Sequence, residues 1–145
     1  MTALTLRTCV LAACLVTSLC AEDASTAVAA ARRYKAAAAY LDGRITWWMG
    51  WRSAARDHDT FCVSCHTVLP YAMARPSMRA ALGEQEISPT EHKLLANVGK
   101  RVRMWNEVAP FYPDKAPADP KTAESRGTES ILNALILAGY DAAKG

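Results

Sequence analysis

The stretch FCVSCHT, residues Phe61 to Thr67, holds two cysteines separated by two residues and a histidine directly after the second cysteine. A Cys-x-x-Cys pair serves in three kinds of site: half of a zinc site, a thiol redox pair, or the anchor of a covalently bound haem. Each kind of site belongs to a different type of small domain. The other residues must therefore indicate which kind of site this stretch forms and which fold surrounds it.

The whole chain sets the first limits. With 145 residues it has room for one modest core. Hydrophobic residues make up 51% and charged residues 21%, which is ordinary for a globular protein. The formal net charge of +3 is too small to indicate a nucleic-acid-binding protein. We therefore expect no nucleic-acid partner.

Residues 1–21 have the layout of a secretory signal peptide. They contain one basic residue, Arg7, no acidic residue, and an apolar run from Cys9 to Leu19 that is too short for a transmembrane helix. Cleavage after Ala21 is expected, which predicts a periplasmic or otherwise exported protein. The competing interpretation is a lipoprotein leader with a lipid attached to Cys14, and only that leader would bring the protein to a membrane.

Removal of this leader changes the number of cysteines. The leader contains Cys9, Cys14 and Cys20, so the exported body keeps only Cys62 and Cys65. Such a body has no disulfide framework, although its destination is oxidising. The pair at the quoted stretch is then the only thiol chemistry in the mature protein.

Cys62, Cys65 and His66 together match the attachment motif of c-type haem. Two thiols add to the vinyl groups on one edge of the porphyrin, and the adjacent histidine binds the iron as its proximal ligand. In bacteria this attachment takes place outside the cytoplasm, in agreement with the leader. A zinc site would have to recruit His58 and His92, or His66, at spacings that match no standard finger. A thiol redox pair is expected to follow a strand, and none is predicted here. We therefore predict one covalent haem c.

Helix signals dominate the rest of the chain, and no strand pattern is found. The stretch Ser88–Glu91 is a capping box that predicts a helix up to Val108. The apolar stripe expected on this helix consists of Leu94, Leu95, Val98, Val102 and Trp105, and its solvated face is expected to carry Lys93, Lys100, Arg101 and Arg103. The other expected elements are a helix over Ser25–Asp42 that Gly43 can end, a short helix over Pro76–Leu82 before Gly83, an extended proline-rich loop over 110–120, and a helix over Thr122–Ala138.

Other residues are candidates to surround the haem. A low-spin electron carrier needs a second axial ligand, and His58 or Met73 is the leading candidate, because each lies near the motif in a polar or irregular stretch. His92, Met49, Met78 and Met104 are further candidates, and five-coordinate iron is a further possibility. The residues expected to line the pocket or to bind the propionates are Trp47, Trp48, Tyr71 and Arg75.

Four blocks of the chain also resemble a known family. They are AAAYLDGRITWWMGW (37–51), ARDHDTFCVSCHTVLPYAMARPSMR (55–79), HKLLANVGKRVRMWNEVAPFY (92–112) and KTAESRGTESILNALILAGYDA (121–142). They are similar to the N-terminal part of a bacterial family in which a CxxCH segment precedes a squalene-cyclase/prenyltransferase-like helical toroid. The resemblance implies haem attachment at Cys62, Cys65 and His66. It also implies a downstream domain that this chain lacks.

These observations predict an all-α fold, a small cytochrome c-like helical domain around one covalent haem. The expected domain covers residues 22–109, followed by a proline-rich linker at 110–120 and a terminal helix at 121–145, the possible start of a missing helical domain. The predicted function is electron transfer by an exported monohaem c-type cytochrome to a redox partner or an attached domain, rather than catalysis. The alternatives are the haem-bearing fragment of a terpenoid-cyclase-like oxidative enzyme and a zinc-binding structural module. Because haem would supply much of the core, the apoprotein is expected to fold poorly.

Overall fold

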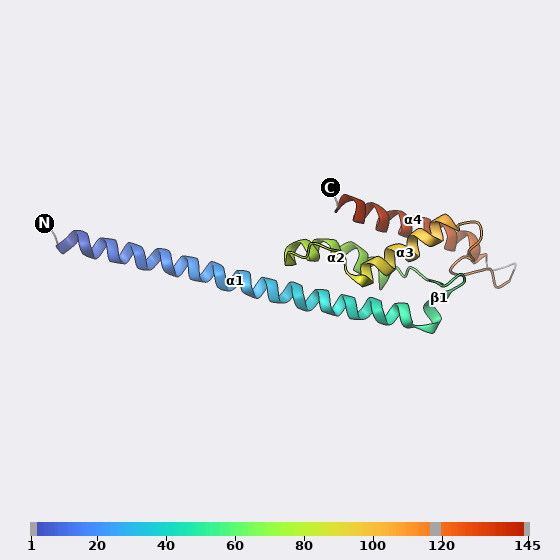
Figure 1. Ribbon diagram of the computed structural model, residues 1–145, viewed down its shortest axis with the longest axis horizontal. Coiled ribbons are helices and arrows are strands. Elements are labelled where there is room, and N and C mark those ends of the chain that lie inside the picture. Colours follow the sequence, from blue (N-terminus) through green and yellow to red (C-terminus); the bar gives the residue numbers. More distant parts are fainter. Residues whose placement is uncertain (1–2, 117–119, 144–145) are drawn as a thin grey trace.

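The computed structural model describes residues 3–116 and 120–143, with side chains described from residue 25 onward. The elements are α1 (Ala3–Gly50), the 3-10 turn η1 (Arg52–Ala54), β1 (Ala55–Arg56), β2 (Thr60–Phe61), α2 (Val68–Leu82), α3 (Pro89–Arg103) and α4 (Lys121–Ala142). Figure 1 shows α2 lying along the C-terminal half of α1, α4 on the side of α2 away from α1, and α3 running from α1 to α4. The prediction of a mainly helical fold is confirmed.

The first helix is longer than predicted. We expected Gly43 to end it, but α1 continues to Gly50, and Trp51 then turns into extended backbone with φ −77° and ψ 124°. A glycine inside a helix costs only about 1 kcal/mol relative to alanine. Ile45 is fully buried beyond it, so packing outweighs that cost.

The predicted leader lies outside the residues whose side chains are described. Its cleavage after Ala21 and the alternative of lipid attachment at Cys14 therefore stay predictions. In the part of the chain that the structure covers, no helix is both long enough and apolar enough to span a membrane.

The second helix is also longer than predicted. Instead of a short helix from Pro76, α2 begins at Val68 and runs through two prolines. Pro70 lies in the first turn, where a backbone N–H has no partner within the helix, so its missing donor costs little. Pro76 is interior and deletes the hydrogen bond to the carbonyl of Ala72. Gly83 ends the helix as predicted, with a positive φ of 69° that suits glycine.

The capping box of α3 is confirmed. The backbone N–H of Glu91 donates to the Ser88 hydroxyl (3.2 Å), and the Ser88 N–H donates to the Glu91 carboxylate (2.8 Å). The same carboxylate is fully buried and forms an ion pair with Arg79 of α2. A capping residue thus also joins two helices.

Four predictions about α3 and α4 need correction. The helix α3 ends at Arg103 rather than Val108, and α4 runs from Lys121 to Ala142 rather than over Thr122–Ala138. Within the apolar stripe Leu94 and Val98 are fully buried, whereas Val102 is exposed. Arg101 was expected in solvent and is completely buried, because a carboxylate of α4 lies beside it.

A small hairpin, which the sequence analysis missed, precedes the motif. β1 and β2 pair antiparallel, with Ala55 opposite Phe61 and Arg56 opposite Thr60. Strands of two residues are too short to show an alternating pattern, so periodicity could not find them. The turn between them is tight, and His58 and Asp59 both have a positive φ of 52°.

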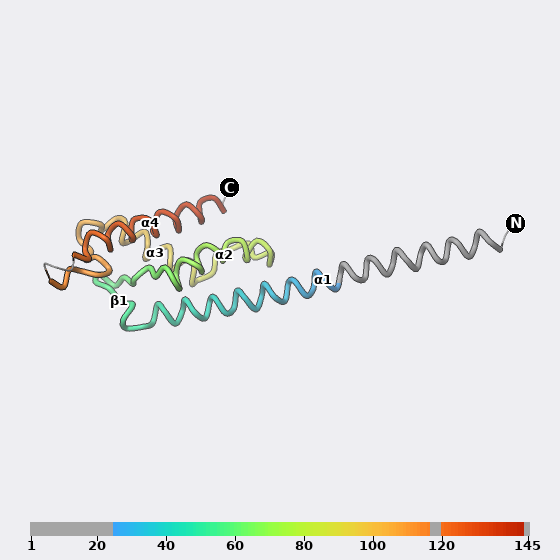
Figure 2. Tube along the Cα trace, turned by 180° about the vertical axis from the view of Figure 1, so that it is seen from behind, coloured from blue at the N-terminus to red at the C-terminus, as the bar shows by residue number. Residues whose placement is uncertain are grey.

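The core joins all the helices. Its buried cluster includes Ile45 from α1, Tyr71 from α2, Leu94 and Val98 from α3, and Ile136 from α4. The segment before α4 takes part as well, since Phe111 belongs to the same cluster. Figure 2, from behind, shows α4 beside α3, with the hairpin at one end of this body. Residues 110–116 and α4 therefore belong to the same packed unit as the CxxCH motif.

Candidate functional site

The CxxCH motif occupies the short connection between β2 and α2. Residues 62–64 are irregular, and residues 65–67 form a turn that leads directly into α2. Cys62 is buried, whereas Cys65 and His66 are exposed. Both cysteines are free thiols. The motif thus has one end inside the protein and the other at its surface.

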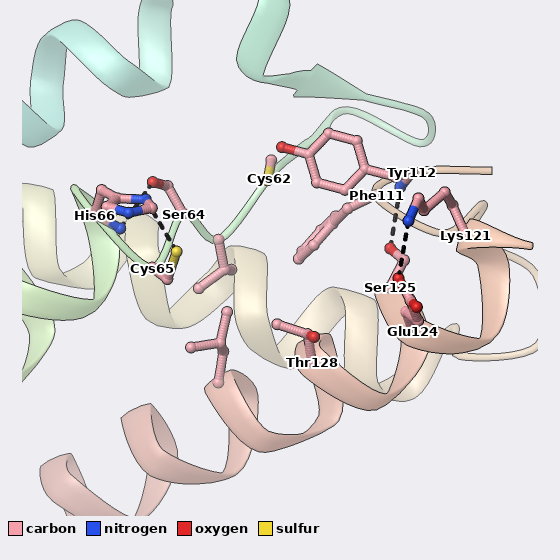
Figure 3. Close-up of a pocket in the computed structure, with 12 residues that line it drawn as sticks. Cys62, Ser64, Cys65, His66, Phe111, Tyr112, Lys121, Glu124, Ser125 and Thr128 are labelled. Carbon is pink, nitrogen blue, oxygen red and sulfur yellow. Dashed lines mark hydrogen bonds and ion pairs between the residues drawn. The ribbon is translucent and has the colours of Figure 1, made fainter. Parts of the chain in front are cut away.

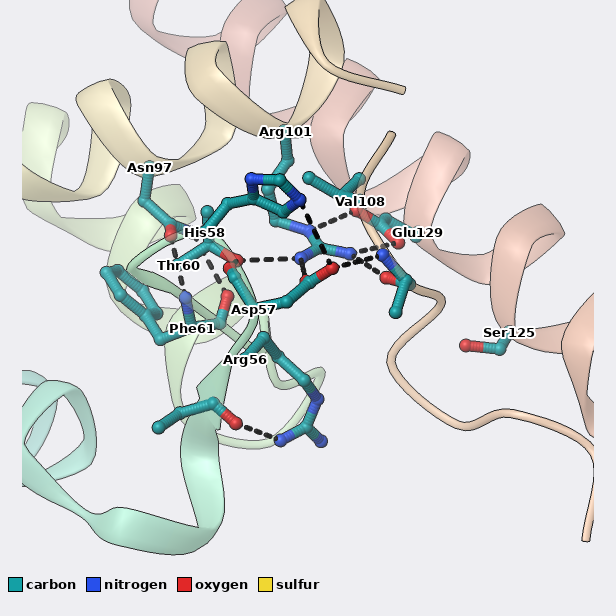
Figure 4. Close-up of polar contacts among 12 residues, drawn as sticks. Arg56, Asp57, His58, Thr60, Phe61, Asn97, Arg101, Val108, Ser125 and Glu129 are labelled. Atoms are coloured by element: carbon teal, nitrogen blue, oxygen red, sulfur yellow. Dashed lines mark hydrogen bonds and ion pairs between the residues drawn. The ribbon is translucent and has the colours of Figure 1, made fainter. Parts of the chain in front are cut away.

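Three parts of the fold hold the inner end in place. The indole N–H of Trp48 on α1 donates to the carbonyl of Cys62 (2.7 Å), and the N–H of Cys62 donates to the carbonyl of Ala54 (2.8 Å). The side-chain amide of Asn97 on α3 accepts from the N–H of Phe61 (2.8 Å) and donates to its carbonyl (3.1 Å) (Figure 4). The backbone at Cys62 is therefore fixed before any cofactor chemistry is considered.

A buried charge network lies next to this anchor. The Arg101 guanidinium donates to the Glu129 carboxylate from Nε (2.5 Å) and from a terminal nitrogen (3.1 Å). It also donates to the Thr60 hydroxyl and to the carbonyl of Ala109, each at 2.7 Å. Figure 4 shows the guanidinium between α4 and the hairpin. Because buried charges must be paired and hydrogen-bonded, this network ties the hairpin to α3 and α4.

A cavity of about 290 Å³ opens beside the motif. Cys62, Cys65 and His66 lie along one side of it, and Figure 3 shows α4 facing them. The remaining lining residues are Val63, Ser64, Phe111, Tyr112, Lys121, Glu124, Ser125, Thr128 and Leu132. The α4 residues recur at helical spacing and therefore share one face of that helix. All three predicted attachment residues thus border a single cavity.

The two thiols have different environments. Burial raises the pKa of the Cys62 thiol, while Arg56 and a hydrogen bond with Tyr112 partly oppose this rise. Next to Cys62, the pKa of the Tyr112 hydroxyl is also raised. The Cys65 sulfur lies 3.0 Å from Nδ1 of His66. Cys62 and Tyr112 are therefore both neutral at pH 7, and the cavity holds no ionised thiolate at its inner end.

The lining residues fit a haem in chemical terms. Two thiols open onto the cavity from one side with a histidine next to the second, and Val63, Phe111 and Leu132 supply apolar walls. The polar groups at the α4 side include Lys121, whose ammonium lies 3.2 Å from the Glu124 carboxylate. The cavity is at the small end of the roughly 300–1,000 Å³ typical of cofactor sites. A porphyrin is therefore expected to reach beyond the cavity into solvent.

The two predicted distal ligands are not among the residues that line this cavity. His58 is exposed in the hairpin turn, where its Nε2 lies 3.8 Å from the Asp57 carboxylate. Met73 is on the outside of α2 and is 53% exposed. Among residues 25–116 and 120–143, no methionine lines this cavity, and His66 is the only histidine that does. The assignment of His58 or Met73 to the iron stays a prediction.

The residues predicted to line the pocket lie elsewhere too. Arg75 is already paired with Asp42 (3.3 Å) and Glu84 (2.7 Å). Tyr71 is buried in the core. Trp47 is half exposed and stacks on Trp51 with ring centroids 5.3 Å apart. Of the predicted residues only Trp48 touches the motif, and it binds the backbone of Cys62 rather than the cavity.

The zinc alternative finds no ready-made site in the described residues. Among residues 25–116 and 120–143, no three or more His, Cys, Asp or Glu side chains come close enough to hold a metal ion. A structural zinc site requires four ligands. Of the histidines considered as zinc ligands, His66 lines the cavity of Cys62 and Cys65, whereas His58 and His92 do not.

The sequence analysis did not predict the side of the cavity that faces the motif, which is formed by Phe111, Tyr112 and α4. Residues 110–120 were expected to be a linker, yet Phe111 and Tyr112 line the cavity. A signal did exist on α4, because Lys121, Ser125, Thr128 and Leu132 lie on one helical face. The sequence pattern did not indicate that this face of α4 lies opposite the cysteines.

Comparisons with known proteins add no relative. No protein-family model matches this chain. No curated protein and no solved structure matches it either. The resemblance to proteins with a squalene-cyclase/prenyltransferase-like toroid therefore rests on the quoted sequence blocks alone.

Proposed function

We propose that this protein is an exported monohaem c-type cytochrome that transfers electrons. In this proposal Cys62 and Cys65 hold the haem by thioether bonds, and His66 is the proximal ligand of its iron. The observation that carries the proposal is that these three side chains border one cavity. When bound, the haem supplies a one-electron couple between ferrous and ferric iron.

The chemistry of attachment suits the two thiols. In each addition the sulfur bonds to one vinyl carbon and the thiol hydrogen goes to the other, so nothing is released and no oxidant is needed. Cys65 is exposed at the mouth of the cavity, while Cys62 lies at its inner end. Hydrogen bonds from Trp48 and to Ala54 hold the backbone of Cys62, whereas Cys65 is exposed and can adjust to the second vinyl group.

The position of the motif suits electron transfer. Cys65 and His66 are both exposed, which places this end of the attachment site at the surface of the protein. A redox partner in contact with that surface can deliver or accept one electron at a time. Export follows from the predicted leader and from the place where c-type haem is attached in bacteria. Contact with a membrane is proposed only for a form lipidated at Cys14.

The direct test is covalent haem. The full chain, leader included, is produced in a bacterial host that matures c-type cytochromes, and the exported protein is examined by pyridine haemochrome spectrum and intact mass. We expect one haem per chain and loss of all covalent haem in a Cys62→Ala, Cys65→Ala variant. A folded, exported protein without covalent haem would contradict the proposal.

A second candidate function is suggested by one distance. The Cys65 sulfur lies 3.0 Å from His66 Nδ1 and is exposed, so Cys65 could be the attacking thiol of a dithiol pair, with Cys62 as the resolving partner. In that case the two thiols would lose two hydrogens to an oxidant such as a partner disulfide. The intact mass separates the two candidates, because a disulfide lowers the mass by two hydrogens whereas haem attachment raises it by one haem.

A further inference from the structure

We infer that one face of α1 is a docking surface for a membrane rich in anionic lipids. This surface, the outer stripe, consists of Tyr40, Arg44, Trp47 and Trp51. The electron-transfer proposal by itself brings in a membrane only through lipid on Cys14, and the outer stripe adds a route that needs no such lipid. It also needs no haem, so it stands whether or not covalent haem is found.

The residues of the outer stripe share one side of the helix. Their positions, 40, 44, 47 and 51, have the spacing that places side chains on one helical face. The buried positions Ala38 and Ile45 belong to a different face, and Figure 1 shows α2 lying along this part of α1. Tyr40 is 68% exposed, Trp47 49% and Trp51 41%, and Arg44 is exposed as well. The outer stripe is therefore an aromatic and basic surface open to solvent.

The aromatic rings of the outer stripe are ordered at the surface. Trp47 and Trp51 stack with their ring centroids 5.3 Å apart and their planes at 17°. The Arg44 guanidinium lies over the Trp47 ring, 4.6 Å from its centroid. Tryptophan, tyrosine and arginine each combine an apolar body with a polar end, and such side chains favour the boundary between lipid headgroups and acyl chains. The outer stripe thus has the composition that suits the headgroup layer of a bilayer.

The charge of α1 selects an anionic surface. The basic side chains described on α1 are all exposed: Arg32, Arg33, Lys35 and Arg44. The only acidic residue within 25–50 is Asp42. Its carboxylate lies 3.3 Å from the guanidinium of Arg75 on α2, so it faces that helix rather than the outer stripe. The exposed side of α1 is therefore positively charged and complements anionic headgroups.

The shape of the surface favours a bilayer over an acidic protein. A specific protein interface centres on a few aromatic or arginine anchors that fill pockets of the partner and are ringed by other contacts. The outer stripe is instead a single row along one helix, about 17 Å long at 1.5 Å per residue. Lipid headgroups can move aside for such a ridge and close around it, whereas an acidic protein would need a groove of matching shape.

Vesicle sedimentation tests the inference. The exported protein is mixed with vesicles of phosphatidylcholine alone, or of equal parts phosphatidylcholine and phosphatidylglycerol, at low and at high salt. We expect binding to the mixed vesicles at low salt, and much weaker binding at high salt or to the neutral vesicles. Lipid on Cys14 would hold the protein on both kinds of vesicle, so the difference between them reports the outer stripe. Equal affinity for both, or no binding to either, would overturn the inference.

Variants assign the binding to the outer stripe. Arg44→Gln is expected to weaken binding to the mixed vesicles roughly fivefold, the effect of one basic side chain near an anionic bilayer. The double variant Trp47→Ala, Trp51→Ala is expected to weaken it roughly tenfold or more, because two apolar ring surfaces are lost. Circular dichroism shows whether each variant keeps its helices, and Arg44→Gln removes an exposed charge without touching the core.

Matched controls come from the other helices. Arg103→Gln removes an exposed charge from α3, and the double variant Ile131→Ala, Leu135→Ala removes exposed apolar surface from α4. Both controls should bind the mixed vesicles as the unchanged protein does. Equal losses in controls and stripe variants would overturn the assignment to α1. A loss with Arg44→Gln but none with the tryptophan variant would mean attraction by charge alone, as an acidic protein would also supply, and would overturn the bilayer as the partner.

Discussion

At the scale of single residues, Arg101 shows how a charge can organise this site. It is fully buried, yet each of its guanidinium nitrogens donates to a defined acceptor: Glu129, Thr60 or the carbonyl of Ala109. Its planar head also lies over the Phe111 ring, with 4.4 Å between its central carbon and the ring centroid. One side chain therefore connects the hairpin before the motif to α4 and to Phe111, which lines the cavity.

We predict that Arg101→Met destabilises the protein by about 3–5 kcal/mol, because it leaves the Glu129 carboxylate buried without its partner. Urea unfolding followed by circular dichroism measures the loss. Arg103→Met is the matched control, since Arg103 is exposed on the same helix, and its effect should stay within about 0.5 kcal/mol. If the double variant Arg101→Met, Glu129→Leu lost as much stability as the sum of the two single variants, the two charges would not be coupled.

A second residue-scale prediction concerns alkaline pH. Burial raises the pKa of both Tyr71 and Tyr140, and the nearby Glu91 carboxylate adds to the rise. Below about pH 10 these tyrosines are neutral in the folded and unfolded states alike. Above it they ionise in the unfolded chain first, so folding stability falls as the pH rises towards the raised folded values.

Replacement of Tyr140 by Phe should therefore reduce this fall, and the urea midpoint should drop less between pH 8 and pH 11 than in the unchanged protein. Tyr40→Phe is the control, because Tyr40 is 68% exposed. A Tyr140→Phe protein with an unchanged pH dependence would show that this hydroxyl does not contribute to alkaline unfolding.

At the scale of elements, α2 carries the motif at its N-terminus and a proline in its interior. The helix begins two residues after His66, so the exposed end of the CxxCH segment and α2 form one continuous piece of backbone. Pro76 weakens the middle of this helix by one backbone hydrogen bond. The burial of Arg75 and Arg79 on either side of it keeps the helix in place.

We predict that Pro76→Ala stabilises the protein by about 1–3 kcal/mol, because it restores the donor to the carbonyl of Ala72 and removes the cost of an interior proline. Pro70→Ala is the matched control. It replaces a proline of the same helix in the first turn, where no donor is needed, and should change the free energy of unfolding by less than about 0.5 kcal/mol. Equal effects of the two substitutions would contradict this explanation.

The elements also show which features a sequence can predict. The capping box at Ser88 and the stop at Gly83 were predictable, because each depends on residues a few positions apart. The continuation of α1 past Gly43 was not predictable, because it depends on the packing of Ile45 against distant helices. The pairing of Arg101 with Glu129 was missed for the same reason. In the site, the three motif residues were found from their spacing, whereas Tyr112 and the α4 face came only from the tertiary structure.

At the scale of the whole molecule, the relation between core and cavity differs from the expectation. The sequence suggested that haem would supply much of the core. The described side chains of all four helices form a buried cluster of their own, and one edge of that cluster lines the cavity. Cys62, Val63, Phe111 and Leu132 belong to both, so the cavity opens directly onto the core.

We therefore predict that a Cys62→Ala, Cys65→Ala variant loses its haem and keeps most of its helical circular dichroism. The helices have one another to pack against, so they do not depend on the cofactor for burial. The far-ultraviolet spectrum of the purified variant, compared with that of the haem-bearing protein, measures this. A large loss of helix would restore the original expectation that the haem is the core.

The long first helix has a consequence for local stability. From Ser25 to Ala36 its side chains are exposed, and Ala38 is the first buried residue after them. A helical stretch whose side chains are exposed gains little from burial, and it is marginal when it is shorter than about 12–15 residues. In a mature chain that begins near residue 22, amide hydrogens before Ala38 should exchange with deuterium rapidly, and those between Ala38 and Trp48 should be protected. The change from rapid to slow amide exchange along α1 would therefore locate the residue at which the packed part of the protein begins.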